Sequence, residues 1–337
     1  AVGHGQQTAA TPASSAGAEI DRGYITPDAM LAAVVFPRRI MLAPEMELMP
    51  IEIVTAAGLK EWGFDPVTVE EVLVIVQAPK EKGEDPEAGA VVRFTERFPG
   101  SIFPTLVART TKGEIDGRAF RRGVNECDAS LMRVDDRTMI IAPESLLRKM
   151  LANVAKPQDG EARRRLDNMK GQLDAAVVVT LDPLRPLIAE EFKKAKIPPM
   201  LMGLKRLPDL VESAELQVKY FGNPCFDVSL RAKDEESAKQ LETMINGLMD
   251  MGQMMAKEQF KQQAASGDPV ECAAAQYGNR VLPRFVDMFR PVRKGDCLTL
   301  SLGDIAKRPG LQLNGVATTS ILVGMLLPAV SAAREAG

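Results

Sequence analysis

The order of apolar and polar stretches repeats along this 337-residue chain, and the repeat restricts the fold more than any other feature. Residues 30–36 form a continuous apolar run that ends at a proline, which is typical of a buried strand. Residues 175–181 form a second run of this kind. Matching Val69-Glu70 to Val211-Glu212 gives nearly the same offset as matching these two runs. We therefore predict an internal duplication.

Each half is expected to contain the element order β-α-β-β-α-β, which is the ferredoxin-like or split βαβ arrangement. The predicted fold class is α+β, with two tandem modules of this kind and an apolar C-terminal helix. The first helical region is interrupted by Pro44 and Pro50 and ends near Gly63. The expected strands are 30–36, 69–76, 90–94, 129–134, 138–141, 175–181, 215–220, 226–231 and 298–302, and the expected helices are 40–62, 98–112, 143–154, 161–172, 184–206 and 234–262.

Polar stretches set the expected domain boundaries. Residues 1–20 are rich in Ala, Gly, Ser and Thr and cannot bury enough apolar surface to fold alone. Such a stretch is typical of the segment after a removed export signal, with a fragment boundary as the alternative. We therefore expect an extracytoplasmic protein, located in the periplasm, in the cell envelope or secreted. The predicted units are a flexible leader (1–22), a first α+β module (23–156), a connecting helix or linker (157–172), a second α+β module (173–310) and the C-terminal helix (311–337).

Composition excludes several function classes. Lys and Arg number 42 and Asp and Glu 45, so the net charge of −3 argues against nucleic-acid binding and polybasic membrane binding. The one histidine, His4, lies in the leader, which excludes Ser-His-Asp and Cys-His catalysis and most zinc sites in the folded body. Dinucleotide, phosphate-loop and nucleophile-elbow motifs are absent. We therefore predict no catalytic residue, no cofactor and no metal site.

The cysteines form no C-x-x-C motif, so zinc and thioredoxin-like chemistry are not indicated. Cys272 and Cys297 are the closest pair along the chain and are the disulfide candidate if the protein is exported. Four buried thiols that act as small apolar residues are the alternative.

A methionine cluster in the long helix of the second half has two interpretations, because thioethers also bind Cu(I). Leu241, Met244, Ile245, Leu248, Met251 and Met255 share one helical stripe, whereas Met249 and Met254 lie on opposite flanks. The stripe favours a core helix with Met as a gap filler.

Paired acids and short basic clusters are interpreted as solvated surface. Glu70 and Glu71 are neighbours on a strand, so their side chains are expected on opposite faces. The basic clusters Arg38-Arg39, Arg121-Arg122 and Arg163–Arg165 are interpreted in the same way, with binding of a phosphate or an acidic glycan as the alternative.

The tail carries a family resemblance. Leu326–Val330, followed by Ala332–Ala336, resembles a segment of the prepilin-like proteins of planctomycetes, whose pseudopilin-like domain has no assigned activity. In that family the segment is the second half of the long pilin helix. This chain departs from the family because Gly315–Thr319 replaces the upstream pilin signature. The preceding residues look similar to the extracytoplasmic modules found before such segments, which implies a larger precursor.

The predicted function is that of a non-enzymatic extracytoplasmic structural or interaction protein, as a cell-envelope or filament component. It would associate with itself or a protein partner through its tail, by residues Ile321, Leu322, Met325, Leu326, Leu327 and Val330. The apolar run is too short to span a bilayer, so docking on a membrane surface or on the chain's own second module stays open. The alternative function is a peptide, glycan or small-ligand binding module that uses the groove between the repeats. An enzyme using carboxylates or lysine is the third hypothesis.

Overall fold

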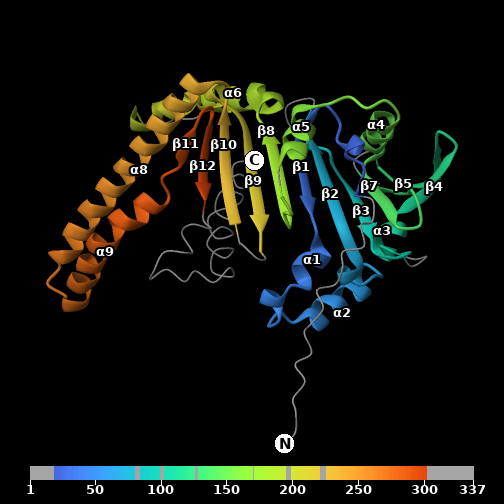
Figure 1. Ribbon diagram of the computed structural model, residues 1–337, viewed down its shortest axis with the longest axis horizontal. Coiled ribbons are helices and arrows are strands. Elements are labelled where there is room, and N and C mark those ends of the chain that lie inside the picture. Colours follow the sequence, from blue (N-terminus) through green and yellow to red (C-terminus); the bar gives the residue numbers. More distant parts are fainter. Residues whose placement is uncertain are drawn as a thin grey trace, which may run out of the picture.

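Twelve strands form one antiparallel sheet in the computed structural model, which describes residues 19–79, 84–98, 102–125, 128–169, 171–194, 199–220 and 225–301. Their order across the sheet is β11-β12-β10-β9-β8-β1-β2-β3-β7-β6-β5-β4 (Figure 1). The α+β class is thus confirmed. The strands are β1 (Ala29–Val35), β2 (Val69–Gln77), β3 (Ala88–Phe94), β4 (Thr110–Ile115), β5 (Arg118–Gly123), β6 (Ser130–Arg133), β7 (Thr138–Ala142), β8 (Ala175–Thr180), β9 (Val211–Lys219), β10 (Cys225–Ala232), β11 (Val292–Lys294) and β12 (Cys297–Ser301).

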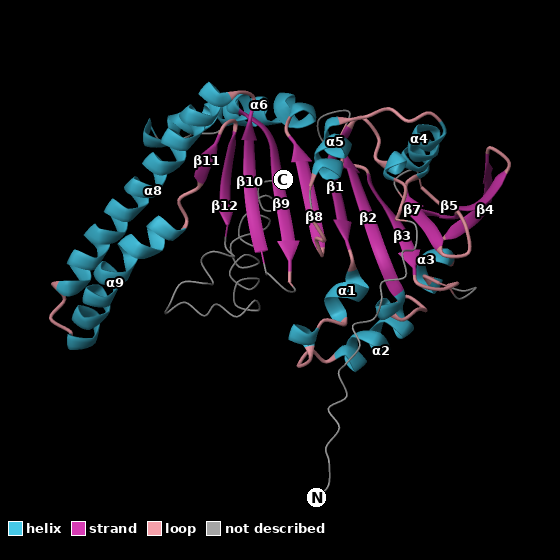
Figure 2. Cartoon of the chain, in the orientation of Figure 1, coloured by secondary structure: helices cyan, strands magenta, loops and turns pink. Residues whose placement is uncertain are grey.

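Helices cover parts of both sheet faces, and two long ones, α8 and α9, form a hairpin that projects from one end of the sheet (Figure 2). None of the helices in the described ranges is long and apolar enough to cross a membrane. The α-helices are α1 (Pro37–Met41), α2 (Ile51–Glu61), α3 (Pro104–Val107), α4 (Glu144–Ala155), α5 (Glu161–Asn168), α6 (Arg185–Lys194), α7 (Leu207–Leu210), α8 (Glu235–Ala264) and α9 (Pro269–Met288). Short 3-10 turns are η1 (Arg22–Tyr24), η2 (Pro44–Met46), η3 (Pro66–Thr68), η4 (Asp182–Leu184) and η5 (Pro199–Arg206).

The main core lies between the sheet and helices α4 and α5. It draws Leu146, Leu147 and Met150 from α4 and combines strand residues of both halves, such as Ile75 and Val178. Two smaller cores lie on the opposite face: one surrounds Phe64, Phe94 and Phe98, and the other joins Leu241 of α8 to Leu298 of β12. Strands β2 and β9 each alternate between these faces, as the two-residue period of a strand requires.

The two halves repeat the same strand order outward from the central β1–β8 pair. The first half reads β1-β2-β3-β7-β6, and the second reads β8-β9-β10-β12-β11. In both halves, helices are inserted between the first strand and the second. A longer insertion follows the third strand; it contains β4 and β5 in the first half, and α8 and α9 in the second half.

A β-bulge occurs at the same place in both halves. Val69 and Glu71 lie opposite Phe94 and Arg93, which leaves Glu70 as the extra residue. In the second half, Val211 and Ser213 lie opposite Ala232 and Arg231, which leaves Glu212 as the extra residue. A bulge changes the direction of a strand at one defined residue. The shared position of the bulge therefore aligns Glu70 of the first half with Glu212 of the second.

Backbone hydrogen bonds beyond the bulge also match. The N–H of Thr95 donates to Thr68, and the N–H of Lys233 donates to Leu210. These pairs follow the bulge in each half and fix the strands in the same register.

Neither half shows the predicted ferredoxin-like arrangement. In that arrangement a later strand lies between the first strand and the second, whereas here β1 pairs directly with β2, and β8 pairs directly with β9. The two modules also share one sheet because β1 pairs with β8. The expected C-terminal helix, 311–337, lies outside the described residues.

The predicted elements match most of the described strands and helices, with three omissions: the β4–β5 hairpin, helix α9 and the three-residue strand β11. The hairpin of β4 and β5 was not expected, although its turn, Asp116-Gly117, carries the positive φ angles of 49° and 76° that favour this dipeptide in hairpins. Helix α9 was also missed, although Asp268 and Pro269 form a typical helix start.

The methionine stripe of α8 is only partly buried. Leu241 is buried, and Met244 and Ile245 pack on the same core. Met255, however, is 60% exposed, so its assignment to the core was wrong. The reason is the length of the 30-residue helix, whose C-terminal half extends past the sheet and lies along α9 (Figure 1).

Both edge strands of the sheet are short and charged. β11 has three residues, among them Arg293 and Lys294. β4 carries exposed Lys112 and Glu114. Short, charged edges of this kind are usual in natural sheets.

Gly58 of α2 is expected to tolerate no side chain. A Cβ at this position would lie 2.2 Å from Cδ of Pro66, so alanine must displace η3. We expect Gly58→Ala to lower the free energy of unfolding by about 1–3 kcal/mol in urea denaturation. Gly247→Ala is the matched control, because Gly247 lies inside α8 with open space around it. The control is expected to gain up to ~1 kcal/mol, and a similar gain for Gly58→Ala would contradict the prediction.

Candidate functional site

An exposed apolar surface lies on the segment between β1 and η3. Large apolar side chains of this segment face solvent, and that of Leu48 is 97% exposed. We call this the α2 surface; its members are Leu42, Leu48, Met49, Ile53, Leu59 and Trp62. Single exposed apolar residues are common, but six within one short segment are typical of an interaction site.

The local sequence explains why α2 leaves these side chains outside. Proline begins α1 and η2, and Pro50 precedes α2, so the segment folds as three short pieces. Only Gly58 of α2 is buried, where it meets Pro66. Gly63, at φ 76°, then ends the helix and returns the chain to buried Phe64, as the sequence predicted.

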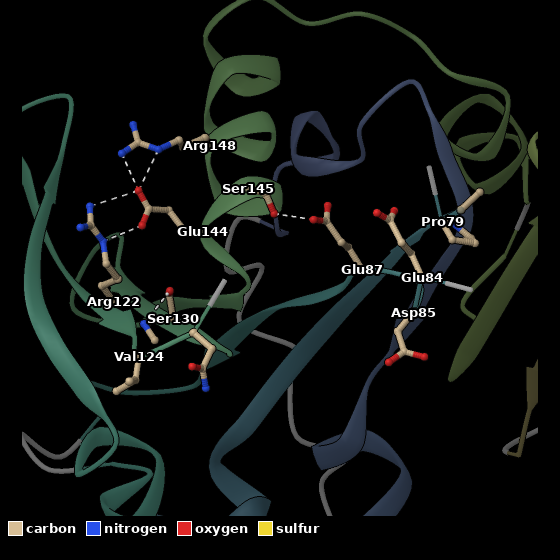
Figure 3. A pocket seen from close by; sticks show the side chains of 13 residues that line it. Pro79, Glu84, Asp85, Glu87, Arg122, Val124, Ser130, Glu144, Ser145 and Arg148 are labelled. Carbon is tan, nitrogen blue, oxygen red and sulfur yellow. Dashed lines mark hydrogen bonds and ion pairs between the residues drawn. The ribbon is translucent and has the colours of Figure 1, made fainter. Parts of the chain in front are cut away.

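A polar cleft of about 760 Å³ opens between the ends of β2 and β5 and the start of α4 (Figure 3). Its lining residues lie within the first half of the chain. A smaller cavity, of about 440 Å³, lies beside α6 and α7 around Phe192 and Lys205. Both cavities belong to one half each, so neither is a groove between the repeats.

Two arginines share one carboxylate on one wall of the cleft. Arg122 Nε lies 2.6 Å from Glu144 Oε2, and Arg148 Nη2 lies 2.6 Å from Glu144 Oε1. The hydrogen bonds from Arg148 and then from Arg122 lower the pKa of Glu144 below its ordinary value of 4.5. Two guanidiniums against one carboxylate leave this wall with a net positive charge.

The opposite wall is acidic. Glu84, Asp85 and Glu87 lie on the β2–β3 connection, and Figure 3 shows them across the cleft from the two arginines. Ser145 of α4 lies between the walls, and its Oγ donates a 2.5 Å hydrogen bond to Glu87 Oε1. The other oxygen of Glu87, Oε2, is buried and accepts no hydrogen bond from the described residues.

The described part of the structure does not bring together the site residues that the sequence predicted, namely the tail residues and the cysteine pair. The tail residues Ile321, Leu322, Met325, Leu326, Leu327 and Val330 lie outside the described ranges. The two cysteines of the disulfide candidate, Cys272 and Cys297, are free thiols in the structure. Cys272 lies near the start of α9 and Cys297 begins β12, so a helix about 24 Å long separates positions that are close in sequence.

Charged residues dismissed as solvated surface have more specific partners. Arg122 lines the cleft, and Arg39 donates to the carbonyl of Leu173. Glu71 is 2% exposed and pairs with Arg22. Glu70 pairs with Arg137 and also with Arg93, which lies opposite Glu71, so the bulge breaks the alternation that the strand period predicted for these two side chains. Among the described residues, no group of three or more His, Cys, Asp or Glu side chains is placed to hold a metal.

Comparisons with known proteins add no relative: no family model, no curated protein and no solved structure matches this chain.

Arg148→Met is expected to raise the pKa of Glu144 toward 4.5, because it removes the hydrogen bond with the largest effect. NMR titration of the Glu144 side chain measures this shift. The depressed pKa contributes stability above about pH 4.5, and that stability is lost as the pH falls through the folded-state value. The pair is half exposed, so the contribution is at most ~1 kcal/mol.

The matched control for this titration is Arg121→Met. Arg121 is the neighbour of Arg122 on β5, so its side chain points to the opposite face. An equal pKa change in both variants would contradict the assignment.

Proposed function

We propose that this protein is a non-enzymatic extracytoplasmic structural or interaction protein that associates with itself. In this proposal the apolar segment Ile321–Val330 of one copy binds the α2 surface of a second copy. The observation that carries it is the exposure of six large apolar side chains on that one segment.

Two features support binding of the apolar segment to the α2 surface: the charges near each of them, and the length of chain that precedes the segment. Glu47 and Glu52 lie beside the α2 surface, and Glu61 there is paired with Lys60, whereas Lys307 and Arg308 precede the apolar segment in sequence. The described chain ends at Ser301, and the residues between Ser301 and Ile321 can span about 60 Å when extended. This length reaches a neighbouring molecule, and complementary charge favours the encounter.

The state of the cleft supports the non-enzymatic part of the proposal. Glu144 has a perturbed pKa, which is common at active sites, but the shift is downward. A carboxyl group held ionised by two arginines is a poor proton donor or acceptor near neutral pH. Ser145 bonds to a carboxylate rather than to an imidazole, so it lacks the usual activating base.

We also infer that the two halves descend from one duplicated unit. Shared strand order, a bulge at Glu70 and at Glu212, and matching backbone hydrogen bonds support this origin. The repeated unit would be an antiparallel meander with helical insertions.

Light scattering on three proteins tests the proposed association. The full chain is expected to form a dimer or a larger assembly. A version that ends at Gly315 is expected to be monomeric, because it lacks the apolar segment. The Leu48→Lys/Ile53→Lys variant is also expected to be monomeric, because two lysines on the α2 surface oppose both apolar contact and the basic flank.

The matched control is Val270→Lys/Val292→Lys, which places two lysines at exposed apolar positions outside the α2 surface. It should assemble as the full chain does. A monomeric full chain would refute self-association. If the shortened version were then also less stable, the segment would instead pack on its own molecule.

A further inference from the structure

We propose that the polar cleft of the first half binds the zwitterionic form of a short peptide, with the peptide carboxylate at Arg122 and Arg148 and its ammonium group at Glu87. This site is separate from the α2 surface and does not depend on self-association. The proposal stands on the volume of the cleft, the charge of its two walls and one buried oxygen that has no donor among the described residues.

The volume favours a ligand larger than a single amino acid. About 760 Å³ lies in the upper part of the range for small-molecule sites. Ala78, Pro79, Gly123 and Val124 supply apolar lining, and the other lining residues are polar or charged. A short peptide combines polar backbone groups with charged ends and so matches this composition.

The basic wall is suited to a carboxylate. Arg122 and Arg148 are each nearly half exposed although both bind Glu144. One carboxylate cannot occupy all the donors of two guanidiniums, which carry five N–H groups each. Planar guanidiniums bind a second carboxylate through paired, charge-assisted hydrogen bonds.

The acidic wall is suited to an ammonium group. Glu87 Oε1 is held by Ser145, which orients the carboxylate, and Glu87 Oε2 is buried without a donor from the part of the chain that the structure describes. A buried acceptor that lacks a hydrogen bond is costly, so a donor from a ligand would gain more here than at an exposed oxygen. Asp85 on the same wall adds negative charge.

The acidic wall and the basic wall of the cleft are carried by different elements of the fold, which keeps them apart. The acidic residues follow β2, whereas Arg122 lies near the end of β5 and Arg148 lies one turn into α4 (Figure 3). The sheet and α4 are joined by the main core, in which Leu146 and Leu147 are fully buried. The separation of charges is therefore built into the scaffold, and it distinguishes a ligand with two opposite ends from a simple anion.

Calorimetric titration with four forms of one peptide tests the proposal. Triglycine carries both end charges, and N-acetyl-triglycine carries only the negative charge. Triglycine amide carries only the positive charge, and N-acetyl-triglycine amide carries neither. Triglycine is expected to bind on the order of tenfold more tightly than either singly charged form, since each removes one charge-assisted contact. Raising the salt concentration should weaken its binding, because the arginines are partly exposed.

Substitutions in the cleft test which wall binds the carboxylate of the peptide and which binds its ammonium group. Arg148→Met should abolish the preference for a free carboxylate, and Glu87→Gln should abolish the preference for a free ammonium group while still accepting from Ser145. Arg121→Met and Glu96→Gln are the controls outside the cleft and should bind as the unchanged chain does. Equal affinity for triglycine and N-acetyl-triglycine would overturn the proposal in favour of an anion site. No binding of any probe in the millimolar range by the folded protein would also overturn it.

Discussion

Antiparallel pairing of β1 with β8 holds the molecule together. Five residues of β1 lie opposite five of β8, and the pair joins two similar halves into one sheet. The main core depends on this pairing, because Val34 of the first half and Val178 of the second pack beneath the same helices. The polar cleft and the α2 surface both lie away from this central pair, on helical insertions and at strand ends.

The two halves differ most in the row of residues that crosses the sheet beneath α4. In the first half the row is Leu73, Val91 and Ile140, and all three are fully buried. The corresponding row in the second half is Glu215, Ser229 and Thr299. Apolar residues favour a helix packed on that face, and polar residues do not. The large helix of the second half, α8, accordingly packs on the opposite face.

Sequence periodicity predicted the local elements well and their assembly poorly. The runs at 30–36 and 175–181 are strands because buried apolar runs leave little alternative. Their pairing with one another could not be predicted, since hydrophobic period carries no information about which edges meet. Because β5 was not predicted, Arg122 was interpreted as solvated surface and its place in the cleft was missed. Asp116-Gly117 carried a local signal for that hairpin, whereas the meeting of Arg122, Glu144 and Glu87 depends on long-range strand order alone.

The cleft and the α2 surface both lie mainly on segments inserted between the strands that the two halves share. Glu87 and Arg122 lie near loops at strand ends, and Ile53 lies on the helical insertion after β1. Such positions accept new side chains with little effect on the core, which explains how two similar halves could acquire different surfaces.

The short, charged edges β4 and β11 bear on how copies of this chain can be joined. A sheet with long neutral edges can grow by adding a neighbour's strand, and the backbone then makes the joint irrespective of side chains. Here three-residue β11 offers too few backbone groups for such a joint, and Lys112 and Glu114 charge the other edge. Copies that met at these two described edges would therefore be expected to join through side-chain contacts, which single substitutions can alter, rather than through a continuous cross-β ribbon.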